Sequence, residues 1–301
     1  FNLTSRLSTG VGVRVENGGS KMSGIIRAVP PGNIPTEIEH QFPLFGLTAG
    51  YKINETQNLY AGWTQAYRPV LFKDIIPATP YDLVDPDMKD ANGYNGELGY
   101  RGNHGGLQWD VNVFYLQYND RPGSLTTERN DTVYILRTNI GDSYTYGLEC
   151  YVEYGFALGH RTRLSAFTST SVMESRYQNG ALRTGQENTD ISGNRVESAP
   201  TLISRNGITL RHREHSFSIL YSYTGETYAD ALNTEKPSAS GSVGLVPAYH
   251  LMDLNATLFL TNNLSCRLSV NNLFATSYFT KRPKFYPGPG VWSSDGRSAN
   301  V

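Results

Sequence analysis

The chain has 301 residues and a formal net charge of −1, with 26 Lys plus Arg residues against 27 Asp plus Glu residues. This near-neutral balance gives no reason to expect nucleic acid as a partner. The mean hydropathy is −0.40, and no apolar run approaches the roughly 18 residues that predict a transmembrane helix. Hydropathy therefore predicts no transmembrane helix in these 301 residues. It cannot exclude a transmembrane β-barrel, whose alternating strands average to a polar value.

Apolar and polar residues alternate with period two along most of the chain, and helical periodicity is nearly absent. In "LQWDVNVFY", at 107–115, the two Val residues share one strand face with Leu, Trp and Tyr. Gln108, Asp110 and Asn112 share the other face. The same pattern recurs in "GLECYVEY" at 147–154, "SFSILYSY" at 216–223 and "LMDLNATLFL" at 251–260.

This alternation predicts roughly twelve strands, separated by connections that are short and long in turn. The strands are expected at 3–16, 43–53, 57–67, 93–102, 107–119, 132–156, 161–173, 198–211, 215–227, 248–260, 263–274 and 297–301. The short connections include 54–56, 103–106 and 261–263. The long ones are 17–42, 68–92, 120–131, 174–197, 228–247 and 275–296.

Short and long connections in alternation are typical of an outer-membrane barrel with tight periplasmic turns and long extracellular loops. A soluble β-sandwich would also alternate, but long loops gathered at one end are unusual for it. A propeller would show a recurrent signature every 40–50 residues or so, and none is present. Apolar faces that end in aromatic residues favour membrane girdles, expected to include Tyr100, Trp109, Tyr115, Tyr154 and Tyr223. We therefore predict an all-β fold, a transmembrane antiparallel β-barrel.

The strand count predicts an incomplete barrel. Twelve or so strands that stop within a strand at Val301 leave an open edge, and each unpaired backbone group in lipid costs several kcal/mol or so. We expect residues 1–301 to be the C-terminal portion of a longer barrel. Cys150 and Cys266 have no metal-site spacing and are expected to lie on separate strands, with a disulfide as the alternative.

Several stretches resemble the barrel repeats of TonB-dependent outer-membrane receptors. They are "NLYAGWTQAYRP" at 58–69, "NGYNGELGYRG" at 92–102, "TNIGDSYTYGLECYVEY" at 138–154 and the penultimate-strand motif "SVNNLFATSYF" at 269–279. Three others resemble the ferric-citrate receptors of the FecA type. They are "TGETYADALNTEKP" at 224–237, "GLVPAYHLMDLNA" at 244–256 and "YPGPGVWSSDGRS" at 286–298.

The resemblance implies a 22-stranded barrel with an N-terminal plug and a TonB-contacting segment ahead of it. This chain would supply about the last twelve strands, without the plug domain and the final strand residues. The implied function is an outer-membrane receptor that takes up a ferric siderophore. The FecA-type resemblance implies that this ligand is ferric citrate. Its partners would be outer-membrane lipid and, through the N-terminal region, the TonB–ExbB–ExbD complex. The alternatives are a receptor for cobalamin, haem or another chelate, or an extracellular β-rich adhesin or glycan-binding protein.

An anionic ferric chelate needs cations and hydrogen-bond donors at the extracellular mouth, and the arginine fork binds carboxylates best. The candidates near loop ends are Arg68, Arg121, Arg137, Arg176 and Arg282. The alternative for each is a solvated loop charge or a contact to anionic lipid head groups. The resemblance also implies that two mid-barrel loops, at 68–92 and 120–131, close over the ligand.

No enzyme, cofactor or metal site is expected from the sequence. "DPDMKDANG" at 85–93 does not fit a calcium loop, because Lys89 occupies a ligand position and the Gly comes too late. The six His residues show no zinc spacing, and no nucleophile elbow or phosphate loop is present. Glu149 and Glu153 share a strand face and are expected to line the lumen rather than to form an acid–base pair.

Overall fold

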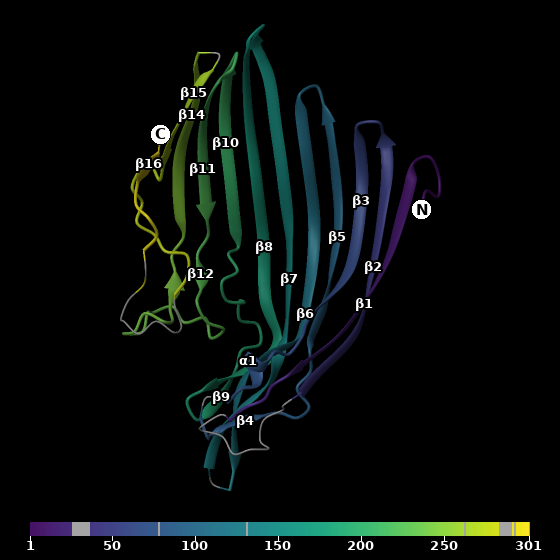
Figure 1. The fold of residues 1–301 in the computed structure, drawn as a ribbon, viewed down its shortest axis with the longest axis vertical. Coiled ribbons are helices and arrows are strands. Elements are labelled where there is room, and N and C mark those ends of the chain that lie inside the picture. The colour runs from purple at the N-terminus through teal and green to yellow at the C-terminus, as the bar shows by residue number, and fades with distance from the viewer. Residues whose placement is uncertain are drawn as a thin grey trace.

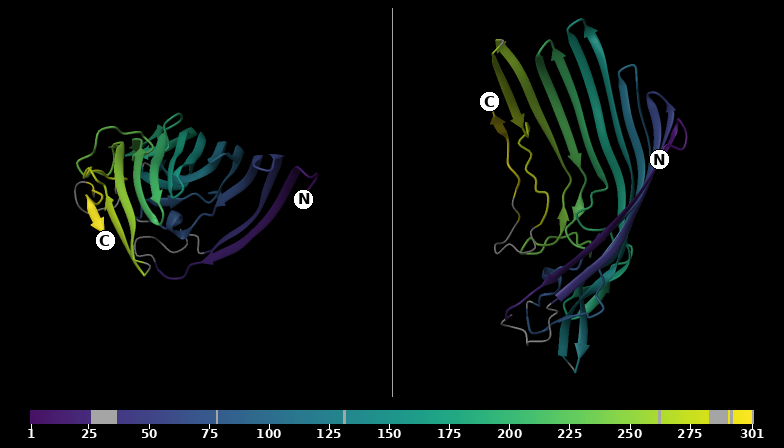
Figure 2. Two further views of the ribbon diagram at one scale, coloured as in Figure 1. Left: turned by 90° about the horizontal axis from the view of Figure 1, so that it is seen from above. Right: turned by 45° about the vertical axis from the view of Figure 1, so that its right-hand side comes forward.

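The computed structural model describes residues 1–25, 37–77, 79–130, 132–261, 263–282, 291 and 293–300. One large sheet, antiparallel along its main path, contains most of the strands, and those of the main path follow chain order from β1 to β16 (Figure 1). Seen from above, the sheet is an open arc, with the two chain ends at its opposite edges (Figure 2). Among the described residues, no helix has the length and apolar character needed to cross a bilayer.

The sheet runs β1-β2-β3-β5-β6-β7-β8-β10-β11-β14-β15-β16, and β4 and β9 pair off this path with β7 and β8. Its strands are β1 Leu7–Lys21, β2 Glu37–Asn54, β3 Gln57–Arg68, β5 Ala91–His104, β6 Leu107–Arg129, β7 Thr132–Gly159, β8 Thr162–Thr184, β10 Leu202–His212, β11 His215–Thr224, β14 Tyr249–Thr261, β15 Leu264–Asn271 and β16 Ser298–Asn300. The smaller elements are α1 Phe72–Ile75, β4 Asp82–Val84, β9 Glu187–Asp190, β12 Thr227–Tyr228 and β13 Leu245–Val246. Each predicted strand overlaps one strand of the main path, which confirms the all-β prediction.

Tight turns join the strands at one end of the sheet, and longer connections lie at the other (Figure 1). The tight turns fall between β2 and β3, β5 and β6, β7 and β8, β10 and β11, and β14 and β15. The other end carries α1, β4, β9 and the small β12–β13 sheet. The short-and-long alternation seen in the sequence is therefore a real spatial division between two ends of the molecule.

The two faces of the sheet differ as the alternation predicts. Leu98, Val113 and Leu148 are neighbours across three strands and share one face, where between 43% and 56% of each residue is exposed. Asn112 and Glu149 oppose each other on the other face, and the Asn112 amide donates to the carboxylate over 3.3 Å. A period-two strand places alternate residues on opposite faces, so one face of the sheet is apolar and the other polar.

Aromatic side chains form two belts across the apolar face. One belt, toward the long-loop end, joins Trp63, Tyr94, Tyr115 and Tyr144 through ring centroids 6.0–6.3 Å apart. The belt near the tight turns includes the Tyr100–Trp109 pair at 5.6 Å and the Tyr154–Phe156 pair at 5.7 Å. Tyr144 and Tyr154 lie ten residues apart on β7. That separation is about 33 Å along the strand and about 25 Å across a bilayer at a tilt of about 40°.

Two segments predicted as long loops are largely strand, so these predictions are wrong. Residues 120–129 continue β6, and β7 begins at Thr132, so the described part of the predicted loop belongs to a long hairpin with Leu125 opposite Leu136. Residues 174–184 continue β8, which then pairs with β9. Strand β1 also continues to Lys21, and β2 already begins at Glu37.

A buried apolar cluster lies at the long-loop end, where the outer part of β8 meets the long connections. Tyr177, Ile191 and Ala231 are each less than 9% exposed and pack together, with Leu182, Val196 and Leu232 against them. This cluster joins the β8–β10 connection to the β11–β14 connection. The two cysteines, Cys150 and Cys266, are free.

Candidate functional site

Three of the five candidate arginines lie at the long-loop end of the β3-β5-β6-β7 part of the sheet. Arg68 is the last residue of β3, Arg121 lies in the part of β6 toward the long-loop end, and Arg137 lies near the start of β7. We call this polar region the mouth: Arg68, Asp74, Asp82, Tyr118, Arg121, Arg137, Ser143, Tyr177 and Glu197.

Arg68 and Arg137 are held by the connection that follows β3. The Arg68 Nη2 atom donates to both Asp74 carboxylate oxygens, over 2.9 Å each. Asp74 also accepts a hydrogen bond from the Leu71 backbone N–H at 3.0 Å, which fixes the start of α1. The hydrogen bond from Arg68 to Asp74 raises the pKa of the arginine, while partial burial opposes that rise. This ion pair is a preformed part of the mouth.

Arg137 binds the same connection at two further points. Its Nη2 atom donates to Asp82 Oδ2 over 2.9 Å, and its Nη1 atom donates to the Asp74 carbonyl oxygen over 3.3 Å. The neighbouring strand β4 pairs in parallel with β7, with Asp82 opposite Ile135. The connection and the β6–β7 hairpin are therefore one docked unit.

Arg121 lies between two tyrosine rings. Its guanidinium carbon is 4.8 Å from the Tyr118 ring centroid and 5.2 Å from that of Tyr177. The Nη1 atom donates to Ser143 Oγ over 3.0 Å, and the Glu197 carboxylate is 3.8 Å from Nη2. This distance to Glu197 is too long for a hydrogen bond. The Arg121 Nη2 group therefore does not donate to Glu197, and it lies beside the faces of the Tyr118 and Tyr177 rings.

Tyr177 orients the acidic member of this group. Its hydroxyl donates to Glu197 Oε2 over 2.8 Å. Burial first, and then the charge of Glu197, raise the pKa of the Tyr177 hydroxyl above its ordinary value. The hydroxyl therefore stays protonated and holds Glu197 Oε2, while Glu197 Oε1 lies 3.8 Å from Arg121 Nη2.

One donor in the mouth has no acceptor. Within the described residues, the Arg68 Nη1 atom is buried and makes no hydrogen bond. A buried arginine donor without an acceptor is costly, so it is a natural point for an anionic oxygen to bind. Together with Arg121, it gives the mouth two donor positions suited to an anion.

The structure places Arg176 and Arg282 away from the mouth. Arg176 lies opposite Tyr144 in the sheet register, on the apolar face, and pairs with Glu174 at 2.6 Å and with the Gly193 carbonyl at 2.7 Å. Arg282 donates to the Leu245 carbonyl over 2.9 Å and lies 5.0 Å from the Phe279 ring centroid. Arg282 thus ties the chain after β15 to the connection before β14.

Sequence reasoning missed the acids and aromatics of the mouth. Asp74, Asp82, Tyr118, Tyr177 and Glu197 give no sequence motif, because their arginine partners lie up to 76 residues away in the chain. No group of three or more His, Cys, Asp or Glu side chains suited to a metal ion occurs in the part of the chain that the structure describes. The mouth offers binding chemistry, namely cations, hydroxyls and ring faces.

Comparisons with known proteins agree on the architecture. The sequence profile of the family described as "TonB dependent receptor-like, beta-barrel" matches residues 1–273. The chain is 20% identical over 239 residues to the vitamin B12 transporter BtuB of Photobacterium profundum, covering 78% of this chain and 34% of that protein.

Two solved structures share the fold. The ferric citrate transporter FecA in its unliganded form matches 87% of this chain with a TM-score of 0.67 and 22% identity. The siderophore receptor PiuA from Acinetobacter baumannii matches 99% with a TM-score of 0.72 and 17% identity. The chain spans 38% and 40% of those two chains, and about a third of the length of BtuB.

Proposed function

This chain belongs to the TonB-dependent receptor β-barrel family of the bacterial outer membrane, and we propose that it forms part of a receptor that takes up a ferric siderophore. Ferric citrate is the ligand that we propose. The observation that carries this proposal is the position of Arg121, between two tyrosine rings in a mouth that also holds the unpaired donor of Arg68.

The family membership orients the molecule in the membrane. In outer-membrane barrels, the tight turns lie on the periplasmic side and the long connections on the extracellular side. The mouth, which lies at the long-loop end, therefore faces the medium from which a chelate arrives. The apolar face, with its two aromatic belts, meets lipid.

The chemistry of the mouth matches an anionic chelate. Ferric citrate presents carboxylates, and an arginine fork binds carboxylate oxygens with short, charge-assisted hydrogen bonds. Arg121 and Arg68 supply such donors, and Tyr118 and Tyr177 supply flat ring faces beside them. In a partly dehydrated vestibule, these bonds are stronger than in bulk water.

We propose that the connection 69–90 and the tip of the β6–β7 hairpin close over the ligand together. They are already joined through the parallel β4–β7 pairing and the contacts of Arg137. Asp74 binds both Arg68 and the start of α1, so it links the ligand-facing donor to this unit. A ligand that binds Arg68 can thus favour the closed position of the connection 69–90 and the hairpin tip.

We further propose that residues 1–301 are the C-terminal portion of the barrel. Within the described residues, β1 and β16 end the sheet path at two unpaired edges. Each unpaired backbone group in lipid costs several kcal/mol or so, which supports a barrel completed by further strands. Energy for uptake would come from the TonB–ExbB–ExbD complex, acting through an N-terminal region of the whole receptor.

Ferric citrate binding to the full-length receptor tests the proposal. Arg121→Gln should weaken binding about tenfold or more, because a charge-assisted hydrogen bond contributes about 1.5–3 kcal/mol. Arg267→Gln is the matched control, since Arg267 is exposed near the tight turn of β15, far from the mouth. Titration calorimetry measures both. Unchanged binding in Arg121→Gln would show that the mouth is not the site.

The second candidate function is a receptor for another ligand, and the similarity to a vitamin B12 transporter supports cobalamin as that ligand. The salt dependence of ligand binding distinguishes the two functions. Binding of an anionic chelate to Arg121 should weaken between about 50 mM and about 500 mM salt, because screening shortens the reach of surface charges. Salt-independent binding of cobalamin, without any binding of ferric citrate, would establish the second candidate instead.

A further inference from the structure

Two neighbouring turns at the periplasmic end carry a dense basic patch. The turn between β7 and β8 contains His160 and Arg161, and the turn between β10 and β11 contains Arg213 and Glu214. The strand ends add Arg163, Arg211, His212 and His215. Glu214 is the single acid in these two turns and strand ends. None of the proposed uptake chemistry uses this patch.

The patch is held together by backbone rather than by ion pairs. The Arg213 N–H donates to the Arg161 carbonyl over 2.7 Å, which fixes one turn against the other. Arg211 lies directly opposite Arg163 in the sheet register, although like charges placed opposite each other destabilise a sheet. Arg161 and Arg213 are exposed, and within the described residues neither forms a salt bridge. By alternation Arg163 and Arg211 follow the polar face, so the turn residues Arg161 and Arg213 supply the unpaired positive charge at the membrane surface.

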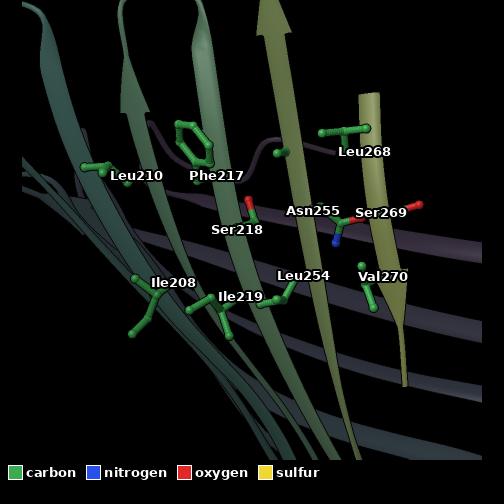
Figure 3. Close-up of a pocket in the computed structure, with 11 residues that line it drawn as sticks. Ile208, Leu210, Phe217, Ser218, Ile219, Leu254, Asn255, Leu268, Ser269 and Val270 are labelled. Atoms are coloured by element: carbon green, nitrogen blue, oxygen red, sulfur yellow. The ribbon is translucent and has the colours of Figure 1, made fainter. Parts of the chain in front are cut away.

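An apolar groove lies on the lipid-facing side of β10, β11, β14 and β15. The row nearest the turns contains Leu210, Phe217 and Leu268 (Figure 3). In the sheet register Ala256 lies between Phe217 and Leu268. A second row, farther from the turns, contains Ile208, Ile219, Leu254 and Val270 (Figure 3). The small Ala256 side chain stands among larger neighbours, so it leaves a depression in an otherwise bulky surface.

The groove and the basic patch are continuous. Leu210 and Phe217 lie three or four residues from Arg213, which is about 10–13 Å along the strands. His212 and Thr162 lie between them, and the Thr162 hydroxyl is 2.8 Å from His212 Nδ1. Arg213 therefore stands at the membrane surface above the groove, with a polar pair at the level of a lipid ester.

We propose that this surface binds an anionic phospholipid of the periplasmic leaflet. Its phosphate lies at Arg161 and Arg213, and an acyl chain fills the groove over Ala256. A phospholipid matches both parts, because it joins an anionic head to an apolar chain at the depth that the two parts define. An acidic periplasmic protein would match the charge alone and would leave the groove without a role.

Native mass spectrometry of the full-length receptor in detergent, titrated with phosphatidylglycerol or phosphatidylcholine, tests the proposal. Phosphatidylglycerol should bind more tightly, and Arg161→Gln with Arg213→Gln should weaken its binding about 25-fold, roughly fivefold for each arginine. Phosphatidylcholine binding should fall less in this double variant, because the choline cation already balances the charge of its phosphate. Ala256→Leu, which fills the depression, should weaken the binding of both lipids.

Matched variants separate this site from general effects. Arg129→Gln with Lys236→Gln removes the same charge from exposed positions at the extracellular end, and Ala61→Leu enlarges an alanine on β3. Both should bind the lipids as the unchanged receptor does. Equal binding of the two lipids, or full binding by the Arg161/Arg213 variant, would overturn the proposal. Loss of binding to an acidic peptide in that variant, with Ala256→Leu binding lipid normally, would overturn it in favour of a protein partner.

Discussion

The membrane-spanning part of the sheet and the mouth are built from the same strands, but different interactions hold them. In the spanning part, the backbone ladder pairs the strands, and lipid covers side chains such as Val113 and Leu148. In the mouth, long-range side-chain contacts dominate, such as Arg137 with Asp82 and Arg121 with Tyr177. The spanning part is thus defined by its surroundings, and the mouth by its own polar contacts.

This difference explains where the molecule can vary. A lipid-facing position requires only an apolar side chain, so many sequences satisfy it. A mouth position requires a particular donor at a particular place, because a buried polar group without a partner is costly. The difference between the two regions is tested most directly by placing a charge at a lipid-facing position and by removing a polar partner in the mouth.

The largest effect is expected from a charge placed in the lipid. Val113→Arg in the full-length receptor should destabilise the protein by about 2–4 kcal/mol, because Val113 lies between the two belts. Asn112→Arg, on the polar face beside Glu149, is the control and should cost far less. Urea unfolding in lipid vesicles gives both free energies. Equal costs at the two positions would mean that the two faces do not differ in their surroundings.

The strands were predictable from sequence because the bilayer imposes the pattern. Lipid on one side and a polar lumen on the other force period-two alternation, and spans such as 107–115 of β6 and 216–223 of β11 show it locally. Outside the bilayer, nothing requires apolar and polar residues to alternate along a strand. The segment after Asp120, with Pro122 and Gly123, reads as a loop although β6 continues through it, with a positive φ of 55° at Asp120 and a register shift at Arg121.

The candidate site was predictable only in residue type. Chelate chemistry indicated arginines near loop ends, and three of the five lie together in the mouth. Which three could not be read from the chain, because their partners are distant in sequence. Arg176, for example, lies only one residue from Tyr177, yet alternation puts it on the other face of β8.

A middle-sized effect is expected where one side chain of the mouth binds two elements. Asp74→Ala removes the acceptor of Arg68 and of the Leu71 N–H, so it should destabilise the segment 71–77 by about 1–3 kcal/mol. Hydrogen exchange of that segment in the full-length receptor measures the loss. Asp87→Ala, an exposed acid of the same connection, is the control. If both variants exchange alike, Asp74 does not hold the closing element.

The smallest effect is expected from Tyr177→Phe, which removes a single hydroxyl. Loss of its hydrogen bond to Glu197 should destabilise the loop cluster around Ile191 by about 0.5–1.5 kcal/mol at neutral pH. The pKa of Tyr177 is raised in the folded protein, so its contribution is complete below the ordinary tyrosine pKa of about 10. It is lost as the pH rises from there toward the folded value, so the difference between the two proteins should shrink in alkali.

Hydrogen exchange of the cluster, at two pH values and corrected for the intrinsic rate, measures that difference. Tyr81→Phe is the control, because Tyr81 is 58% exposed. A Tyr177→Phe penalty that grows in alkali would contradict the raised pKa. No penalty at either pH would mean that the hydrogen bond from Tyr177 to Glu197 contributes nothing to this cluster, and that ring packing alone holds Tyr177 in the mouth.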